Sequence, residues 1–225
     1  MSCRPLMSGR QEATSRTRPH RQEGTHTMKA RKRKEIAGSA SRIGHITLLS
    51  TGRERHLATL RCGTLTFRCA IGRTGISHLK REGDGATPAG RHRILWVYYR
   101  PDRLVPPRTI LPLPVLRQND GWCEDPRHGS YNRPTRLPSS AGHESLWRSD
   151  DLYNIVGVLD WNTRPRVSGR GSAIFLHLCR PDYAPTAGCI ALSLGDLRRL
   201  LGVVSAQVEI AVGAAPRKVP LARRP

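Results

Sequence analysis

The chain has 225 residues, of which 37% are hydrophobic, and its formal net charge is +21. This length allows one domain with a substantial core, and the apolar content excludes a chain that is disordered throughout. No stretch approaches the roughly 18 apolar residues of a membrane-spanning helix, so we expect no transmembrane segment. The charge would attract any polyanion. Because no zinc-finger spacing or aromatic-basic motif accompanies it, we expect no specific nucleic-acid partner.

The two ends of the chain differ in composition from the middle. Residues 1–42 are rich in Arg, Ser, Thr, Gly and His without periodicity, which predicts a disordered basic N-terminal arm. This arm shows no clear signal peptide, because it lacks an apolar run of the usual length. We expect one ordered domain over residues 43–213 and a basic tail over residues 214–225.

The first half of the domain reads as β-structure. Aliphatic and β-branched runs bounded by glycines predict short strands at 45–49, 57–60 and 65–71, before a charged Gly-rich loop at 72–90. Residues 91–99 predict a buried strand. Strict alternation would place Ile94, Trp96 and Tyr98 on one face and Leu95, Val97 and Tyr99 on the other.

Residues 101–138 hold eight of the 17 prolines. Proline cannot donate a backbone hydrogen bond to a sheet, so we expect a long ordered loop or lid here rather than sheet interior. Long loops in compact domains are often functional. Aromatic and amide side chains here and just beyond are candidates to bind substrate, or else to anchor the loop: Trp122, Tyr131, Asn132, His143 and Trp147.

The last third of the domain is again mostly β-structure. Residues 172–177 predict an apolar strand that ends in His177, and a last strand is expected over 203–212. Between them, Ser193 is expected to cap a short helix and Gly202 to end it. The apolar face of that helix would be Leu194, Leu197, Leu200 and Leu201. The sequence therefore predicts a mostly-β domain with a few short helices.

One pair of side chains carries candidate chemistry. His177 precedes Cys189 by twelve residues, and the intervening turn can fold the two side by side. A thiol becomes a strong nucleophile only as a thiolate, which needs a nearby base or positive charge. Gly188 permits close backbone approach, and amides around Cys189 could bind an oxyanion. The pair is compatible with acyl transfer through a thioester, but most Cys/His pairs at such spacing are packing residues.

A wider pattern resembles the L,D-transpeptidase (YkuD-type) catalytic domain. Gly171–His177 followed by Thr186-Ala187-Gly188-Cys189-Ile190 is similar to the family's strand ending in histidine and its [S/T]-x-G-C-[I/V] motif. Gly83–Gly90 resembles its G-D-x-x-T-P-x-G loop. The two landmarks stand in the right order, and the resemblance covers roughly residues 43–212.

The resemblance implies a β-sandwich-like or barrel-like sheet and an enzyme that needs no cofactor. By correspondence with the family motif, Cys189 is the nucleophile, His177 the general base and acid, and Gly188 part of the oxyanion turn, with Thr186 near the histidine. The expected partners are peptidoglycan stem peptides and glycan strands. We accordingly expect the cell envelope or periplasm as the location, and a monomer.

Two departures from the family pattern affect the expected substrate. Ala191 stands where the familiar motif has arginine, which suggests altered substrate contacts. The Pro-rich segment 101–138 resembles a proteobacterial branch in which such a region limits access and the cross-link is of the 1-3 kind.

Several alternatives remain open from sequence. Water as acceptor would make the chain an L,D-carboxypeptidase or amidase, and a degenerate site would leave a basic protein that binds wall polymer or nucleic acid. Cys179 is expected to be a free thiol, with a disulfide to Cys189 as the alternative. His177, Cys179 and Cys189 are possible zinc ligands, but no fourth is evident, so we expect no metal.

Overall fold

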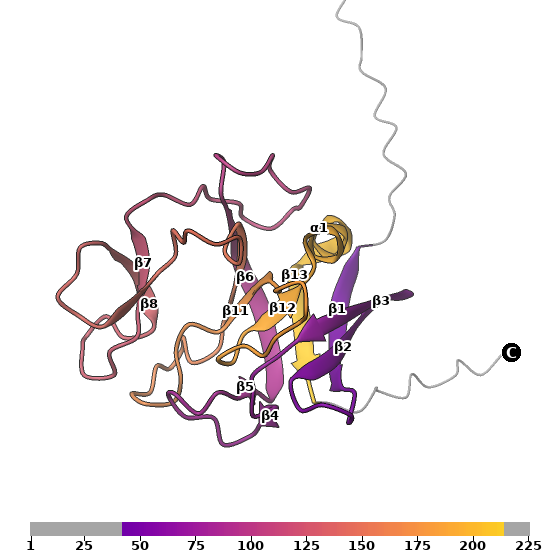
Figure 1. The fold of residues 1–225 in the computed structure, drawn as a ribbon, viewed down its shortest axis with the longest axis horizontal. Coiled ribbons are helices and arrows are strands. Elements are labelled where there is room, and N and C mark those ends of the chain that lie inside the picture. Colours follow the sequence, from indigo (N-terminus) through magenta and orange to yellow (C-terminus); the bar gives the residue numbers. More distant parts are fainter. Residues whose placement is uncertain (1–41, 214–225) are drawn as a thin grey trace, which may run out of the picture. The chain divides into compact units, whose positions relative to one another are not determined.

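The computed structural model describes residues 42–213. Nearly all of the predicted basic arm and the whole predicted tail at 214–225 lie outside the described residues. The described chain is mostly β, which confirms the predicted fold class (Figure 1). The elements are β1 (Ile43–Ser50), β2 (Leu57–Cys62), β3 (Leu65–Ala70), β4 (Ile76–Ser77), β5 (Thr87–Pro88), β6 (Gly90–Tyr99), β7 (Asp120–Cys123), β8 (Arg133–Arg136), β9 (His143–Ser145), β10 (Ile155–Leu159), β11 (Phe175–Leu178), β12 (Ile190–Leu192), α1 (Leu194–Val203) and β13 (Val204–Val212).

Eight strands close into a barrel in the order β1-β13-β6-β10-β11-β12-β3-β2. Most neighbours are antiparallel, but β1 pairs with β13 and β11 pairs with β12 in parallel. Aliphatic side chains from all sides of the barrel meet in one core, including the fully buried Ile46, Leu60 and Leu176. Closure leaves no free edge among these strands, which removes the usual site of edge-to-edge aggregation.

A β-bulge interrupts β6 and corrects the predicted alternation of this strand. Trp96 pairs with Val158 and Ile94 pairs with Leu159, so Leu95 is an extra residue opposite β10. Ile94 and Val97 therefore both enter the barrel core, whereas Leu95 and Trp96 both pack in a second cluster outside it. Strict period-two reasoning was wrong here because the bulge turns two consecutive side chains outward.

The Pro-rich segment also forms a sheet, contrary to the expectation of a loop alone. A three-stranded antiparallel sheet has the order β8-β7-β9, and it lies to the side of the barrel (Figure 1). We call it the insert sheet. Pro134 falls on β8, an edge strand, so its missing N–H does not remove a hydrogen bond from the interior of the sheet. The first part of the Pro-rich segment, before β7, runs alongside β6 and is hydrogen-bonded to it. The Val97 N–H donates to the Pro112 carbonyl, and the Leu116 N–H donates to the Tyr99 carbonyl.

The single helix of the described residues, α1, begins as predicted. The Ser193 hydroxyl accepts from the Asp196 N–H, and Leu197, Leu200 and Leu201 are buried. Two details of the prediction were wrong. Gly202 lies inside the helix, which runs on to Val203, and Leu194 is 38% exposed and outside the apolar face. No helix within residues 42–213 has the length and apolar character needed to span a membrane.

The helix offers a matched test of the core. Leu197→Ala should lower the free energy of unfolding by about 2–5 kcal/mol, because Leu197 is fully buried among barrel side chains. Leu194→Ala, on the same helix, should change it by less than about 1 kcal/mol, because this side chain is partly exposed. Urea denaturation followed by circular dichroism measures both. Equal losses for the two variants would contradict the packing described.

Candidate active site

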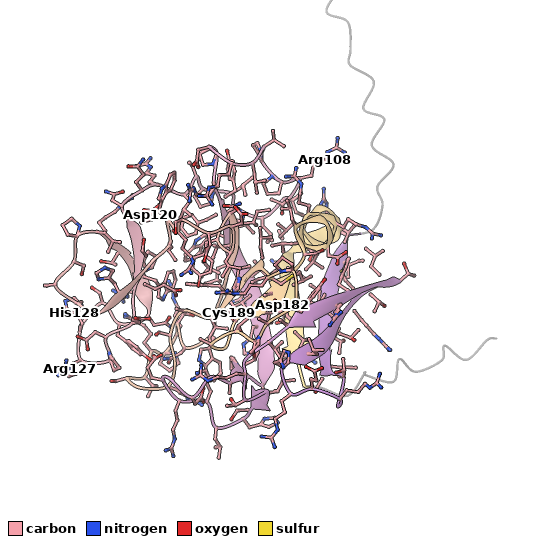
Figure 2. The ribbon with its side chains drawn as sticks, in the orientation of Figure 1. Arg108, Asp120, Arg127, His128, Asp182 and Cys189 are labelled. Atoms are coloured by element: carbon pink, nitrogen blue, oxygen red, sulfur yellow. The ribbon has the colours of Figure 1, made fainter. Side chains whose placement is uncertain are left out.

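Cys189 and His177 are brought together by the parallel pairing of β11 with β12. In this register Leu176 lies beside Ile190 and His177 beside Ala191. The even-numbered residues of both strands enter the barrel core, so Phe175, His177 and Cys189 share the opposite face. His177 is the third of four residues in β11, not its last residue as predicted. Figure 2 shows Cys189 toward the middle of the described domain.

Both side chains line one cavity of about 590 Å³. Its wall comes from the Gly-rich loop, the insert sheet, β11 and the turn before β12. Ionisable side chains dominate this wall in addition to the pair: Lys80, Glu82, Glu124, His143, Glu144, Arg148, Tyr153, Cys179 and Arg180. Its three fixed cations are matched by three carboxylates, so the cavity is close to electrically balanced.

The Cys189 thiol is buried and protonated. It donates to the Ala173 carbonyl (Sγ–O 3.2 Å), and its sulfur accepts from the Phe175 N–H at 3.3 Å. Burial raises the pKa of the Cys189 thiol to about 12, and the nearby Glu144 carboxylate acts in the same direction. At neutral pH almost no thiolate is present, so the nucleophile depends on a base at the moment of reaction.

His177 is held as a neutral base. Its Nδ1 lies 2.8 Å from the Leu178 carbonyl, which can only accept, so Nδ1 carries the proton and Nε2 is left as the acceptor. Burial lowers the pKa of the His177 imidazole to about 4. The Tyr153 ring packs edge-on against the imidazole, with the ring centroids 5.2 Å apart, and fixes its plane. An uncharged imidazole beside a protonated thiol is the resting pair of a general-base mechanism.

The turn before Cys189 is fixed by Thr186 and Gly188. The Thr186 hydroxyl donates to the Cys189 carbonyl at 2.7 Å and accepts from the Gly188 N–H at 3.1 Å. This hydroxyl therefore stabilises the turn, and the Gly188 amide is engaged in the structure as it stands. Gly188 has φ +146°, and an added Cβ would lie 2.8 Å from the Ala86 carbonyl oxygen. The position accepts only glycine without distortion.

The Gly-rich loop reaches the same turn through a buried hydroxyl. Thr87 is fully buried; its Oγ1 accepts from the Gly72 N–H at 2.9 Å and donates to the Gly188 carbonyl at 2.8 Å. Earlier in the loop, the Asp84 carboxylate accepts from Lys80 Nζ at 2.7 Å and from the Ala86 N–H at 2.8 Å. The two sequence landmarks are thus joined directly in space.

The five predicted substrate-binding residues lie in different places. His143 lines the cavity. Trp122 is 2% exposed and donates to Asn132 Oδ1, which also accepts from the Ala173 N–H. Tyr131 is buried and its hydroxyl donates to Glu82, which lines the cavity. Trp147 stacks under the Arg100 guanidinium, 3.5 Å from the ring centroid. The other four residues therefore do not line the cavity. Their contacts instead hold together the insert sheet and the loops around it.

Three cavity residues were missed by sequence reasoning. Lys80 is buried near Cys189. Burial raises the pKa of the Cys189 thiol, and the positive charge of Lys80 lowers it by a smaller amount. The Tyr153 hydroxyl donates to the Glu144 carboxylate at 2.6 Å, and burial raises the pKa of that carboxyl. No motif marks Glu144 or Tyr153, since they reach the cavity only through long-range packing. Lys80 stands next to the Gly-rich motif and could have been suspected from that position.

The strand register decides between the two alternatives for Cys179. By the strand register Cys179 lies four residues along the strands from Cys189, which is about 13 Å. A disulfide spans about 7 Å at most between Cα atoms, so this pair cannot form one, and Cys179 is a free thiol. Within residues 42–213, no group of three or more His, Cys, Asp or Glu side chains is arranged to hold a metal ion.

Comparison with known families decides the assignment. The sequence profile of the L,D-transpeptidase catalytic domain (YkuD) matches residues 49–212, which is more than half of the chain. The chain belongs to the L,D-transpeptidase family. No curated protein matches it. The match spans nearly the whole barrel, from the end of β1 to the end of β13, and both sequence landmarks and the insert sheet lie within the matched range.

The glycine of the nucleophile turn of this L,D-transpeptidase domain can be tested by substitution. Gly188→Ala should lower the free energy of unfolding by about 1–3 kcal/mol and slow modification of Cys189, because the new methyl group meets the Ala86 carbonyl at a positive φ. Gly195→Ala is the matched control: nothing lies within 4 Å of its Cβ, and it sits in α1. The control should be neutral or slightly stabilising. Denaturation and alkylation kinetics report both effects; full stability of Gly188→Ala would contradict the geometry.

The protonation state of the pair predicts the pH dependence of alkylation. With a thiol pKa of about 12, the rate of Cys189 alkylation by iodoacetamide should rise about tenfold per pH unit between pH 7 and pH 10, without a plateau. Peptide-resolved mass spectrometry separates Cys189 from the other five cysteines, Cys3, Cys62, Cys69, Cys123 and Cys179, and Cys189→Ser gives the background. A plateau below pH 8 would instead indicate a thiolate–imidazolium pair and overturn the neutral resting state.

Proposed function

We propose that this L,D-transpeptidase domain forms cross-links between peptidoglycan stem peptides through a thioester on Cys189. The observation that carries the proposal is the placement of a buried thiol and a neutral imidazole on one face of β11 and β12, within a single cavity. Family membership supplies the reaction class. The proposed place of action is the cell envelope or periplasm, as a monomer.

The first half of the proposed reaction makes the acyl-enzyme. His177 Nε2 takes the proton of the Cys189 thiol, which must first turn away from the Ala173 carbonyl. The thiolate attacks the carbonyl carbon of a donor-stem amide. Because the Gly188 amide is already bonded to Thr186, we assign the Cys189 amide as the donor that first meets the oxyanion. As the C–N bond breaks, the leaving amine takes the proton from His177, and a thioester remains.

The second half transfers the acyl group. A neutral amine of an acceptor stem attacks the thioester carbonyl and loses its proton to His177 Nε2. The C–S bond breaks, the sulfur recovers a proton from the imidazole, and a new amide bond joins the two stems. His177 thus carries one proton in each direction in each half-reaction, which a neutral imidazole with a free Nε2 can do.

The Pro-rich segment bears only weakly on the type of cross-link. Of residues 101–138, Glu124 alone lines the cavity, at the end of β7. Any limit on access by this segment therefore acts through the insert sheet as a whole. The proposed 1-3 linkage has to be decided from the products.

Muropeptide turnover tests the proposal. The full chain, Cys189→Ala and His177→Asn are incubated with muropeptides of several stem lengths, and products and protein are analysed by mass spectrometry. We expect cross-linked dimers and an acyl adduct on Cys189 in the wild type, none in Cys189→Ala, and a rate at least about 100-fold lower in His177→Asn. The mass and fragmentation of the dimer identify the linkage.

The matched control is Cys179→Ala, which removes a half-buried thiol of the same cavity and should keep the activity. Shortened monomers without dimers would replace the transpeptidase by a carboxypeptidase or amidase. Absence of both products and adduct at every stem length would overturn the catalytic proposal and favour a binding protein.

A further inference from the structure

A second cavity, of about 580 Å³, meets the insert sheet at the edge opposite to the one that lines the catalytic cavity. The catalytic cavity receives His143 and Glu144 from the edge strand β9, whereas the second receives Arg133 and Pro134 from the opposite edge strand β8. Trp122 of β7, Asn132, the outer face of β6 and the loop that follows β10 complete its wall. Its size is typical of small-ligand sites.

The floor of the second cavity is apolar because of the bulge in β6. The extra residue turns both Leu95 and Trp96 out of the barrel, and both line the cavity. The Trp96 ring is half-buried. Tyr98 packs edge-on against it, with ring centroids 6.1 Å apart, and the buried Trp122 lies at a tilt of 36° with centroids 6.3 Å apart. A fixed indole with an uncovered part is a platform for an apolar ring face.

The wall of the second cavity is strongly cationic. Four arginines line it, Arg93, Arg133, Arg164 and Arg166, against the single carboxylate of Asp160. The catalytic cavity, by contrast, balances its fixed cations with carboxylates. The high net charge of the chain therefore does not explain the difference, because both cavities belong to the same basic domain.

Two of these guanidinium groups are available to a ligand. Arg93 shares the Asp160 carboxylate, with Nε–Oδ2 at 3.4 Å, and Arg166 donates to the Tyr131 carbonyl at 3.0 Å. The side chains of Arg133 and Arg164 are exposed and make no hydrogen bond or ion pair within residues 42–213. Guanidinium groups bind carboxylate and phosphate oxygens in a bidentate manner.

We propose that this cavity is a binding site for an anionic saccharide, whose sugar ring packs on Trp96 and whose carboxylate or phosphate is bound by Arg133 and Arg164. The C–H face of a pyranose ring matches a partly covered indole, and two unpaired guanidinium groups match one oxyanion. A nucleic acid fits less well, because Trp96 is the one partly open ring in the lining and stacking of successive bases needs several. This site goes beyond the proposed transpeptidase reaction and does not require it.

Calorimetric titration of the full chain carrying Cys189→Ala tests the site without turnover. The probes are phosphorylated N-acetylglucosamine, N-acetylmuramic acid, neutral N-acetylglucosamine, inorganic phosphate and a single-stranded oligonucleotide, all at one ionic strength. We expect at least one of the two anionic sugars to bind tenfold or more tightly than both the neutral sugar and inorganic phosphate. The tighter of the two identifies phosphate or carboxylate as the natural anion.

Variants locate the binding. Arg133→Gln with Arg164→Gln should weaken the anionic sugar tenfold or more, whereas Arg53→Gln with Arg61→Gln removes the same charge from exposed positions elsewhere and should change affinity less than twofold. Trp96→Ala should also weaken binding, and Trp96→Phe should keep most of it, with near-UV circular dichroism as the check of folding.

Four outcomes would overturn the proposal. They are no binding at millimolar concentration, equal loss in the two double variants, inorganic phosphate binding as well as the sugars, and a single-stranded oligonucleotide binding at the cavity more tightly than either sugar. Because the nucleophile is absent from the tested protein, none of these results bears on the transpeptidase proposal.

Discussion

The parallel register of β11 and β12 is the constraint on which the candidate site depends. Because Leu176 lies beside Ile190, a thiol and an imidazole twelve residues apart emerge from adjacent strands on the same face. The opposite face of both strands is buried in the barrel core, so a slip of either strand by one residue would turn its own catalytic group inward and away from the other. The packing of aliphatic side chains inside the barrel therefore fixes the geometry of the chemistry outside it.

Local signals in the sequence predicted those parts of the fold that depend on neighbouring residues. The Ser193 cap, the mostly-β class and the glycine-bounded strands depend on short-range hydrogen bonding and periodicity, and they were found. The bulge at Leu95 and the continuation of α1 through Gly202 are set by long-range packing, and they were missed. Strand pairing in the Pro-rich segment was missed for the same reason.

The residues of the candidate site also fall into two groups, those that local sequence signals predicted and those that long-range packing brings to the cavity. Cys189, His177, Gly188 and Thr186 could be named because they lie within a short motif, although the Cys189 thiol and the Gly188 carbonyl are hydrogen-bonded to distant residues. Glu144 and Tyr153 carry no sequence signal, since they reach the cavity only through tertiary packing. Burial, which sets the protonation of the pair, is a property of the assembled domain.

The pairing of β1 with β13 has a consequence for biosynthesis. These are the first and last strands of the described domain, and the barrel cannot close until both are available. During synthesis from the N-terminus, the β1-β2-β3 unit must wait with both edges uncovered, because β3 pairs with β12 and β1 pairs with β13. Contacts of such long sequence separation make folding slow. A chaperone that shields these two edges would therefore act on the domain before its thiol is buried.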